Sequence, residues 1–504
     1  MIAASEAQVA AWLAARSERC IETACARIFL AGDKALKIKR RVNLGYLDFS
    51  TLEARAAAIG RELVFNREAA PDLYLETRTV TQDPAGELAL DGEGQVVDHV
   101  LVMRRFDDGA VLGRAPDRID EALAEALGRM VARLHVHAPT VPPGEGGGAS
   151  ALAYTIGSNA ELLRNLSDDL GKADVEALVE ATWAELERQR PLLERRLAAG
   201  LSRRCHADLH LENILLEEGG PVAFDCIEFS DRLSRIDIQY DLAFLLMDLV
   251  VRGRPQSACL VMSAYFDEAL RSFGPDLLDG LAAMPLMLSV RAAVRAHVCA
   301  HSDDPGGART YLAAALNFIA PQVRPRLVCV GGYSGTGKTT FARQVLPGLG
   351  APPGALLMRT DEVRKRQAGA ASRERLPAGA YGPGARRGVY LHMFEEAARA
   401  LRAGASVVLD ATFLDPRDRD DAAALAKGTG ARFTGLWLEA PEAVLLARIA
   451  ARRNDASDAD AQALRGQLDR GPGPLDWIRI DASGEARDAA AAFLKREGGE
   501  QPCG

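Results

Sequence analysis

Residues 205–216, CHADLHLENILL, combine side chains that could transfer a phosphoryl group to a hydroxyl. Such a transfer needs a proton acceptor, charge neutralisation and a metal that holds the phosphates. Asp208 could take the proton from the hydroxyl, and Asn213, five residues later, could turn back to hold a magnesium ion. Asp225 ends the apolar run PVAFD twelve residues after Asn213, and we expect it to complete the metal site.

A second phosphate-handling pattern lies at residues 331–340, GGYSGTGKTT. It matches G-x-x-x-x-G-K-[ST] in full, with an apolar strand before it and a helix after it. Glycines let backbone N–H groups surround a phosphate, Lys338 can reach the β- and γ-phosphates, and the Thr339 hydroxyl can bind magnesium. The expected ATP-binding residues of this loop are Gly332, Ser334, Gly335, Thr336, Gly337, Lys338, Thr339 and Thr340.

Two later segments of the chain could complete this second site. In SVVLDATF, Asp410 ends a buried strand, where an acidic residue should orient magnesium and its waters. In LARIAARRNDASDA, Arg448 and Arg452 could close over the transferring phosphoryl group on a mobile lid. The alternative for each lid arginine is a solvated helix face.

The first site requires a lysine on a strand and a glutamate on a helix ahead of residue 205. Lys37 in ALKIK is the expected lysine, with Lys39 on the same strand face as its rival. Glu62 in GRELVFNREA is its expected partner, and Met103 begins the MRRF segment that should lie behind adenine. No glycine-rich loop precedes Lys37, where only Gly32 lies in the turn.

Composition limits the remaining function classes. The chain has 504 residues, a net charge of −8 and a pI of about 5.7, which argues against binding nucleic acid or anionic membrane by bulk charge. Its eight cysteines form no CxxC pair, its N-terminus has no basic segment of a signal peptide, and no uncharged apolar run reaches membrane-spanning length. A reducing cytoplasm is the expected location.

The pattern of elements predicts two domains. Residues 20–107 indicate a small lobe of strands with one helix, and residues 108–320 a helical lobe. The two prolines of PQVRPR, residues 321–326, mark the expected boundary. From residue 325 to 504 strands and helices alternate, which predicts a parallel sheet covered by helices.

The HADLHLEN loop and the FDCIEF strand resemble those of the aminoglycoside phosphotransferase family, within the protein-kinase-like fold. LGRMVARLHVH and DIQYDLAFLL are similar to the helices around that family's loop, and the likeness covers about residues 20–315. It implies that Asp208 is the base, that Asn213 and Asp225 hold magnesium, and that Asp241 supports the loop. Nothing here resembles an activation segment ending in APE, so a small molecule is favoured over a protein as substrate.

Residues 326–485 resemble the P-loop kinases that include polynucleotide kinases, gluconate kinases and zeta-type toxins. That likeness implies that Asp361, in the D-x-x-R pattern after the strand ALLMRT, activates the acceptor. It also implies that Arg364 contacts substrate or phosphate, and that Arg417 or Arg419 touches the acceptor. A bare N-cap role for Asp361 is the alternative.

The whole chain therefore resembles the bacterial bifunctional aminoglycoside phosphotransferase/ATP-binding protein family. The predicted fold is an α+β, bilobal kinase-like domain at 1–320, followed by a three-layer α/β/α P-loop domain at 325–504. We expect Mg-ATP at both sites, a small-molecule hydroxyl acceptor, and neither nucleic acid nor membrane as a partner. Two alternatives stay open: the P-loop domain is the only enzyme and the first domain regulates it, or the chain is a nucleotide sensor.

Overall fold

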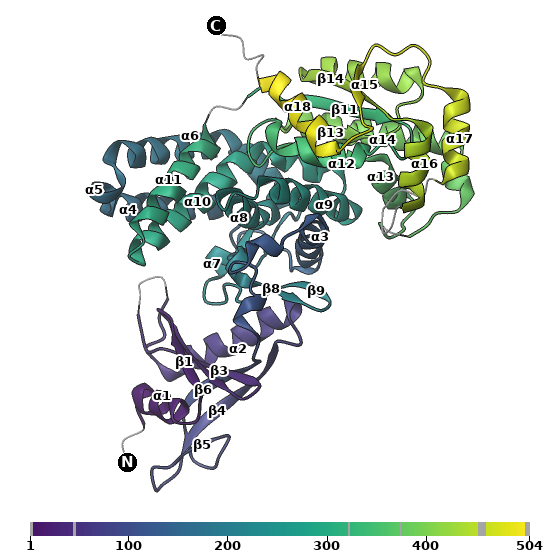
Figure 1. Cartoon of the computed structure of the whole chain (residues 1–504). Coiled ribbons are helices and arrows are strands. Elements are labelled where there is room, and N and C mark those ends of the chain that lie inside the picture. The colour runs from purple at the N-terminus through teal and green to yellow at the C-terminus, as the bar shows by residue number, and fades with distance from the viewer. Residues whose placement is uncertain (1–3, 44–46, 321–322, 373, 452–459, 499–504) are drawn as a thin grey trace. The chain divides into compact units, whose positions relative to one another are not determined.

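The structure is a computed structural model that describes residues 4–43, 47–320, 323–372, 374–451 and 460–498 (Figure 1). By their internal contacts these residues form two compact units. The first comprises residues 1–118, 138–147 and 202–241, and the second comprises 119–137, 148–201 and 242–504. The predicted boundary at 321–326 lies partly outside the described residues.

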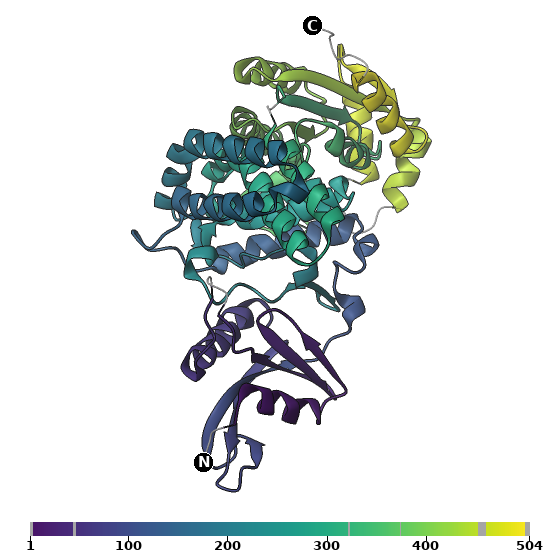
Figure 2. The same cartoon turned by 90° about the vertical axis from the view of Figure 1, so that its left-hand side faces the viewer.

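The small lobe of the first unit is a six-stranded antiparallel sheet in the order β1-β2-β3-β6-β4-β5. Its strands are β1 (Arg19–Glu22), β2 (Ala26–Ala31), β3 (Lys34–Lys39), β4 (Tyr74–Gln82), β5 (Leu88–Leu90) and β6 (Gln95–Arg104). Alternate residues of β6 point to opposite faces. Val100 and Val102 pack with helix α1 (Glu6–Ala14), whereas Leu101 and Met103 pack on the side of α2 (Leu52–Ala69), so the sheet is covered on both faces (Figures 1 and 2).

The segment that carries Asp208 and Asp225 also belongs to the first unit. Two short antiparallel pairs frame it: β7 (Ser202–Arg204) with β10 (Arg235–Asp237), and β8 (Ile214–Glu217) with β9 (Gly220–Ala223). The short helix α7 (Asp231–Ser234) follows, and α8 (Ile238–Val251) begins directly after β10. The two ladders flank the loop, and the FDCIEF segment, residues 224–229, follows β9 without forming a strand itself.

The second unit contains a bundle of helices and a parallel sheet. The bundle comprises α3 (Glu121–His137), α4 (Gly148–Asn165), α5 (Ser167–Leu170), α6 (Lys172–Ala198), α9 (Pro255–Phe273), α10 (Met284–His301) and α11 (Pro305–Ile319). Among the described residues one helical segment, Pro275–His301, is long and apolar enough to cross a membrane. In this fold 78% of its apolar window is buried inside the protein, which is typical of a core helix.

The P-loop domain has a five-stranded parallel sheet in the order β12-β13-β11-β14-β15. The strands are β11 (Arg326–Gly332), β12 (Leu356–Arg359), β13 (Val407–Asp410), β14 (Arg432–Glu439) and β15 (Ile478–Asp481). The helices are α12 (Lys338–Val345), α13 (Thr360–Gln367), α14 (Pro383–Arg402), α15 (Pro416–Thr429), α16 (Glu442–Ala451), α17 (Ala461–Arg470) and α18 (Ala486–Gly498). The predicted parallel sheet is confirmed. The edge strand β15 is a fifth strand, which the sequence analysis did not name.

Helix α9 of the bundle packs against the edge strand β12. The Ser263 hydroxyl accepts a hydrogen bond from the Leu357 N–H at 3.0 Å, and so occupies a donor of the strand edge. Arg366 on α13 is paired with Asp267 of α9 and with Glu396 of α14, and all three side chains are nearly buried. An unpaired strand edge is a site for aggregation, and α9 covers this one.

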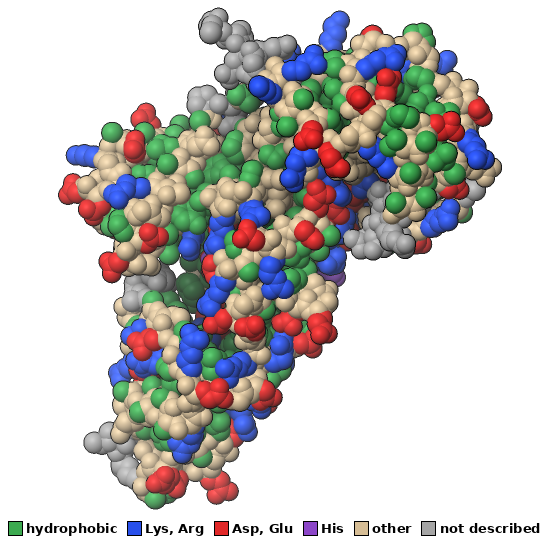
Figure 3. All heavy atoms as spheres, viewed as in Figure 1, with side chains coloured by type: hydrophobic (Ala, Val, Ile, Leu, Met, Phe, Trp, Pro, Cys, Tyr) green, Lys and Arg blue, Asp and Glu red, His purple; other side chains and the backbone are tan. Residues whose placement is uncertain are grey.

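Charged side chains are mixed on the face of the molecule in Figure 3, where Lys and Arg alternate with Asp and Glu over the described surface. This distribution agrees with the modest net charge of −8.

Candidate active sites

Lys37 lies at the centre of a buried charge network in the first unit. Its Nζ atom is 2.6 Å from Oε1 of Glu62 on α2 and 2.8 Å from Oδ1 of Asp225. The rival Lys39 contacts the other oxygen of Glu62 at 2.7 Å and Oε1 of Glu228 at 2.6 Å. Lys37 is therefore the lysine that contacts the expected metal ligand Asp225. Lys39 instead forms an ion pair with the second carboxylate oxygen of Glu62.

Charge pairing outweighs burial for the central groups of this network. Burial opposes the charged form of Glu62, but the two lysines lower its pKa to about 2. Burial likewise opposes the charge on Lys37, yet Asp225 and Glu62 raise its pKa well above the ordinary value. Glu228 differs, because burial and the charge of Glu62 raise its pKa despite Lys39. Lys37 is thus kept as a fixed cation, which is the form that binds phosphate.

The two polar residues of the predicted loop lie against each other. The Asn213 side-chain N–H group donates to the Asp208 carbonyl at 2.9 Å and to its carboxylate at 2.8 Å. His210 Nε2 lies 3.5 Å from the same carboxylate. Because the amide nitrogen of Asn213 is used by Asp208, its oxygen is the atom that could ligate a metal. The Asp208 side chain is 37% exposed, so an incoming hydroxyl could reach it.

Asp241, near the start of α8, is hydrogen-bonded to the backbone of the loop that carries Asp208. Its carboxylate accepts hydrogen bonds from the backbone N–H groups of His206 (3.2 Å) and Ala207 (2.7 Å). Ala207 has a φ of +71°, a conformation that costs an alanine about 1–3 kcal/mol. The buried Asp241 offsets this strain, so its geometry fits the supporting role that the family likeness implies.

Asp225 is also held in a strained backbone conformation, with a φ of +60°. The small lobe supplies the restraints, since the Asp225 N–H donates to the Tyr74 hydroxyl at 3.0 Å and the Cys226 N–H donates to Asn66 Oδ1 at 2.9 Å. The Asp225 side chain is 47% exposed and uses one oxygen for Lys37. Its other oxygen and the Asn213 amide oxygen fit the hard-oxygen donor set that Mg²⁺ prefers.

Met103 lies on β6 opposite Ala35 of β3. It belongs to an apolar cluster that includes Leu215, with Phe106 and Phe224 packed against it. The two rings meet edge to face, with centroids 5.3 Å apart. Met103 thus lies in the buried core on the α2 side of the sheet, and the expected contact of the MRRF segment with adenine stays a prediction.

Replacing Glu62 with glutamine should destabilise the first unit. Lys37 and Lys39 would remain buried with one charge less to balance them, and breaking a buried pair costs about 3–5 kcal/mol. Because the pKa of Glu62 is lowered to about 2, its contribution is present above pH 4.5 and is lost as the pH falls toward 2. Urea unfolding between pH 2 and 6 should therefore show a wild-type advantage that shrinks with acid.

The control for this prediction is Glu68→Gln, which changes an exposed glutamate of the same helix. A Glu62→Gln protein as stable as this control at pH 6 would contradict the role of Glu62 in the network.

In the second unit the glycine-rich loop opens into a cavity of about 980 Å³. Gly335 and Gly337 have φ values of +88° and +86°, and a Cβ on Gly335 would lie 2.6 Å from the Leu445 carbonyl. Six of the eight predicted loop residues line the cavity, and Gly332 and Thr336 are not part of its lining. The first N–H groups of α12 lack intrahelical partners, so they can donate to phosphate.

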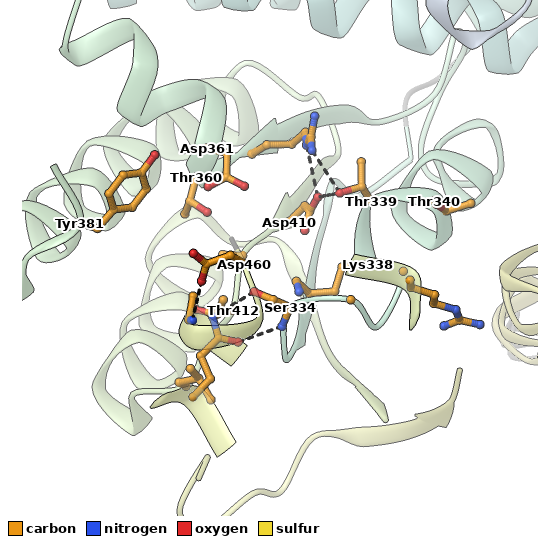
Figure 4. Close-up of a pocket in the computed structure, with 18 of the residues that line it drawn as sticks. Ser334, Lys338, Thr339, Thr340, Thr360, Asp361, Tyr381, Asp410, Thr412 and Asp460 are labelled. Atoms are coloured by element: carbon orange, nitrogen blue, oxygen red, sulfur yellow. Dashed lines mark hydrogen bonds and ion pairs between the residues drawn. The ribbon is translucent and has the colours of Figure 1, made fainter. Parts of the chain in front are cut away.

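Thr339 and Asp410, the two expected magnesium ligands of this site, are hydrogen-bonded to each other (Figure 4). The Thr339 hydroxyl donates to Asp410 Oδ2 at 2.6 Å. Arg359, at the end of β12, donates to Thr339 Oγ1 at 3.3 Å and lies 3.4 Å from Asp410 Oδ2. A hydroxyl next to a carboxylate fits Mg²⁺ and its waters, and Arg359 neutralises Asp410 in this arrangement.

Arg359 also connects this site to the helical bundle. It lies 3.7 Å from Glu362, and Arg129 of α3 lies 3.8 Å from the same carboxylate. Burial, together with the charge of Asp267, raises the pKa of Glu362 to about 7. The magnesium-site arginine thus belongs to a charge network that reaches α3 and α9.

Asp361 lines the cavity near the start of α13 (Figure 4). That helix begins at Thr360 with Arg359 at the N-cap position, so Asp361 is not its capping residue. Arg364 donates to Asp361 Oδ1 at 2.8 Å, and its guanidinium lies 4.9 Å from the ring centroid of Tyr381. One carboxylate oxygen is held by Arg364, and the other is the atom that could accept a proton.

The remaining predicted arginines have different positions. Arg448 lines the cavity and donates to the carbonyls of Ala482 (2.8 Å) and Thr336 (3.4 Å), whereas Arg452 lies outside the described residues. Arg417 is exposed on α15 and is absent from the described cavity lining. Arg419 is buried and holds backbone carbonyls such as that of Phe413 at 2.7 Å. The expectation that Arg417 touches the acceptor is therefore not supported by its position.

Several cavity residues were not singled out from the sequence. Gln467 on α17 accepts a hydrogen bond from the Ser334 N–H at 2.8 Å and donates to its hydroxyl at 2.9 Å. Arg359 directly precedes the TDEVR segment, which contains the D-x-x-R pattern, so the sequence could have indicated a place for Arg359 at this site. Polar cavity residues with no local motif include Arg375, Tyr381, Arg386, Asp460 and Arg470.

Comparison with known proteins agrees with this geometry. Residues 51–281 match the phosphotransferase enzyme family, and residues 327–474 match a family described as an AAA domain. The chain is thus a kinase-type phosphotransferase with two different ATP folds. It belongs to the family in which an aminoglycoside-phosphotransferase-like domain is joined to a P-loop kinase domain, and the predicted family is confirmed.

An uncharacterised protein of Mycobacterium tuberculosis is 32% identical over 482 residues, which cover 92% of each chain. Among solved structures, a gluconokinase from Sinorhizobium meliloti 1021 is 20% identical and covers 34% of this chain and 94% of its own, with a TM-score of 0.25. A choline kinase from Cryptosporidium parvum Iowa II is 12% identical and covers 60% of this chain and 88% of its own, with a TM-score of 0.39.

Proposed function

We propose that this protein is a bifunctional ATP-dependent phosphotransferase, with each site transferring the γ-phosphoryl group of Mg-ATP to a hydroxyl of a small molecule. One observation carries the proposal: each unit holds its own lysine together with its own partly exposed carboxylate. Lys37 lies with Asp208 in the first unit, and Lys338 lines one cavity with Asp361 in the second.

At the first site, Lys37 would hold the nucleotide phosphates, and Asn213 and Asp225 would hold magnesium, which neutralises the phosphates. The acceptor oxygen forms a bond to the γ-phosphorus while the bond to the ADP oxygen breaks, and the hydroxyl proton passes to Asp208. Asn213 holds the Asp208 carboxylate in place through its 2.8 Å hydrogen bond.

At the second site, the N–H groups of the glycine-rich loop and Lys338 would bind the phosphates, with magnesium held at Thr339 and Asp410. Asp361 would accept the proton of the acceptor hydroxyl. Arg448, which already reaches the Thr336 carbonyl of the loop, would contact the transferring group. Positioning and charge neutralisation supply most of the catalysis in such transfers.

We also propose a reducing, cytoplasmic location. None of the cysteines in the described ranges forms a disulfide, and Cys205, Cys226, Cys259, Cys299 and Cys329 are buried. Buried thiols without disulfides are typical of reducing compartments.

The test of this function is ATP consumption by the purified chain against a panel of hydroxylated metabolites, read by mass spectrometry as a gain of one phosphate. A product that depends on Asp208 and another that depends on Asp361 would support two active sites. ADP formation without any phosphorylated product would contradict the transferase function.

Nucleotide binding gives a second prediction. A non-hydrolysable ATP analogue with magnesium should bind at two sites per chain, because the two phosphate-binding sets belong to separate units. Calorimetry should find two sites in the wild type and one in Lys338→Ala. A single wild-type site that disappears in Lys338→Ala would refute the prediction.

A further inference from the structure

The cavity of the P-loop domain is lined by more cationic than acidic side chains. Its lining contains seven cationic and four acidic side chains. The cations are Lys338, Arg359, Arg364, Arg375, Arg386, Arg448 and Arg470, and the acids are Asp361, Asp410, Asp460 and Glu485.

Three of these arginines are already engaged. Arg359 contacts Asp410, Arg364 contacts Asp361, and Arg448 donates to backbone carbonyls. For the other three, Arg375, Arg386 and Arg470, no ion pair with a carboxylate is found within the described part of the chain. Burial raises the pKa of Asp418, and the charge of Arg386 partly opposes this rise. The Asp418 carboxylate itself is paired with Arg387 at 2.9 Å.

Arg470 belongs to the nucleotide side of the cavity. It follows Gln467 by three residues on α17, which places the two side chains on one helix face. Gln467 is hydrogen-bonded to Ser334 of the glycine-rich loop. Arg470 therefore lies where it can serve the phosphates of ATP.

Arg386 and Arg375 line the same cavity as Asp361. Tyr390, one turn after Arg386 on α14, lines the cavity. Its hydroxyl accepts a hydrogen bond from the Phe413 N–H at 2.9 Å and forms another with the Thr412 hydroxyl at 3.3 Å. Arg375 lies in the segment between α13 and Tyr381, and Tyr381 covers Arg364. In Figure 4 Asp361 and Tyr381 are both drawn on the opposite side of Asp410 from Thr339.

We propose that the acceptor of the P-loop site is an anionic alcohol, a hydroxyl compound whose phosphate ester or carboxylate is bound by Arg375 and Arg386. This inference rests on the proposed kinase function of the site. Guanidinium groups form paired hydrogen bonds with either anion, and two cations of one cavity that have no ion pair with a described carboxylate are stabilised by a bound anion. The nucleotide phosphates have separate proposed ligands, namely the N–H groups of the glycine-rich loop, Lys338 and Arg448.

The transfer step leaves this anionic group unchanged. The acceptor hydroxyl forms the new bond to the γ-phosphorus, the bond to ADP breaks, and the proton passes to Asp361. When the anion is a phosphate ester, one class of reaction that supplies such an acceptor is the ATP-dependent phosphorylation of an alcohol. The first site of the same chain is proposed to catalyse that class of reaction.

The experiment uses the full chain with Asp208→Asn, which silences the first site, and matched compounds: glucose, glucose 6-phosphate and gluconate, and glycerol, glycerol 3-phosphate and glycerate. We expect turnover of an anionic member at a kcat/KM at least about tenfold above its neutral partner. Hydrogen bonds to charged groups contribute about 1.5–3 kcal/mol, so Arg375→Ala and Arg386→Ala should each raise the KM for that compound about tenfold or more. The KM for ATP should stay unchanged, and Arg386→Lys should restore part of the loss.

Arg402→Ala is the matched control, because Arg402 is exposed at the other end of α14. Phosphate-ester turnover and carboxylate turnover distinguish the two kinds of anion. Equal turnover of neutral and anionic partners, or equal effects of Arg386→Ala on both, would overturn the inference while leaving the kinase function intact.

A binding measurement covers the case in which no panel compound reacts. Inorganic phosphate is titrated into the chain saturated with a non-hydrolysable ATP analogue and magnesium. We expect binding that Arg375→Ala and Arg386→Ala weaken and Arg402→Ala does not. Absent or unaltered phosphate binding would overturn the inference, whereas Arg386-dependent binding without any phosphate transfer would leave the subsite standing and count against the kinase function.

Discussion

Asp208→Asn is expected to lower phosphate transfer at the first site by about 10²–10⁴-fold, the usual cost of removing a general base. Asparagine keeps the shape of the side chain but cannot accept the hydroxyl proton. The loop should survive the change, because Asp241 holds the backbone N–H groups of His206 and Ala207 independently of Asp208. The measurement is the rate of phosphorylated product at saturating ATP, together with the melting temperature of the variant.

Glu218→Gln, at an exposed turn between β8 and β9, is the matched control and should leave the rate unchanged. Transfer to every accepted substrate at the wild-type rate in Asp208→Asn would mean that the first unit is regulatory. The P-loop domain would then be the only kinase. Loss of transfer at both sites would instead mean that the two sites are catalytically coupled.

Asp361→Asn should cause a loss of similar size at the second site, about 10²–10⁴-fold, and should leave Asp208-dependent transfer intact. Asparagine can still accept the 2.8 Å hydrogen bond from Arg364, so the position of Arg364 over Tyr381 should be kept. The KM for ATP should change little, since Asp361 lies apart from the glycine-rich loop. Lys338→Ala, by contrast, should weaken nucleotide binding at this site alone.

The comparison requires steady-state kinetics of both activities in one preparation. Asp420→Asn, an exposed carboxylate on α15, serves as the control. A wild-type kcat in Asp361→Asn would assign the proton acceptor to another group and contradict the proposed role.

The parts of both sites that are contiguous in the chain could be predicted from the sequence. The glycine-rich loop depends on local backbone freedom at Gly335 and Gly337, and this freedom is encoded at those positions. In the same way, Asp208 and Asn213 meet because they are five residues apart in one loop. Asp410 ends a parallel strand beside β11, and parallel strands bring their carboxyl ends to one edge of the sheet.

Contacts between distant segments could not be predicted in this way. Lys37 and Lys39 are alternate residues of a strand and share a face, so the sequence could not choose between them. Only packing places Lys37, and not Lys39, against Asp225, which is 188 residues away in the chain. The same holds for Tyr74, whose hydroxyl holds the backbone of Asp225.

The P-loop domain also separates what local motifs predict from what only packing decides, and its arginines are the example. The sequence by itself determined that a phosphate loop, a strand-end carboxylate and a D-x-x-R pattern occur together, because each is a short local motif. The tertiary structure decided that Arg417 faces solvent, while Arg375 and Arg386 line the cavity. An arginine has the same chemistry on any face of a helix, so its function depends on how the helix packs.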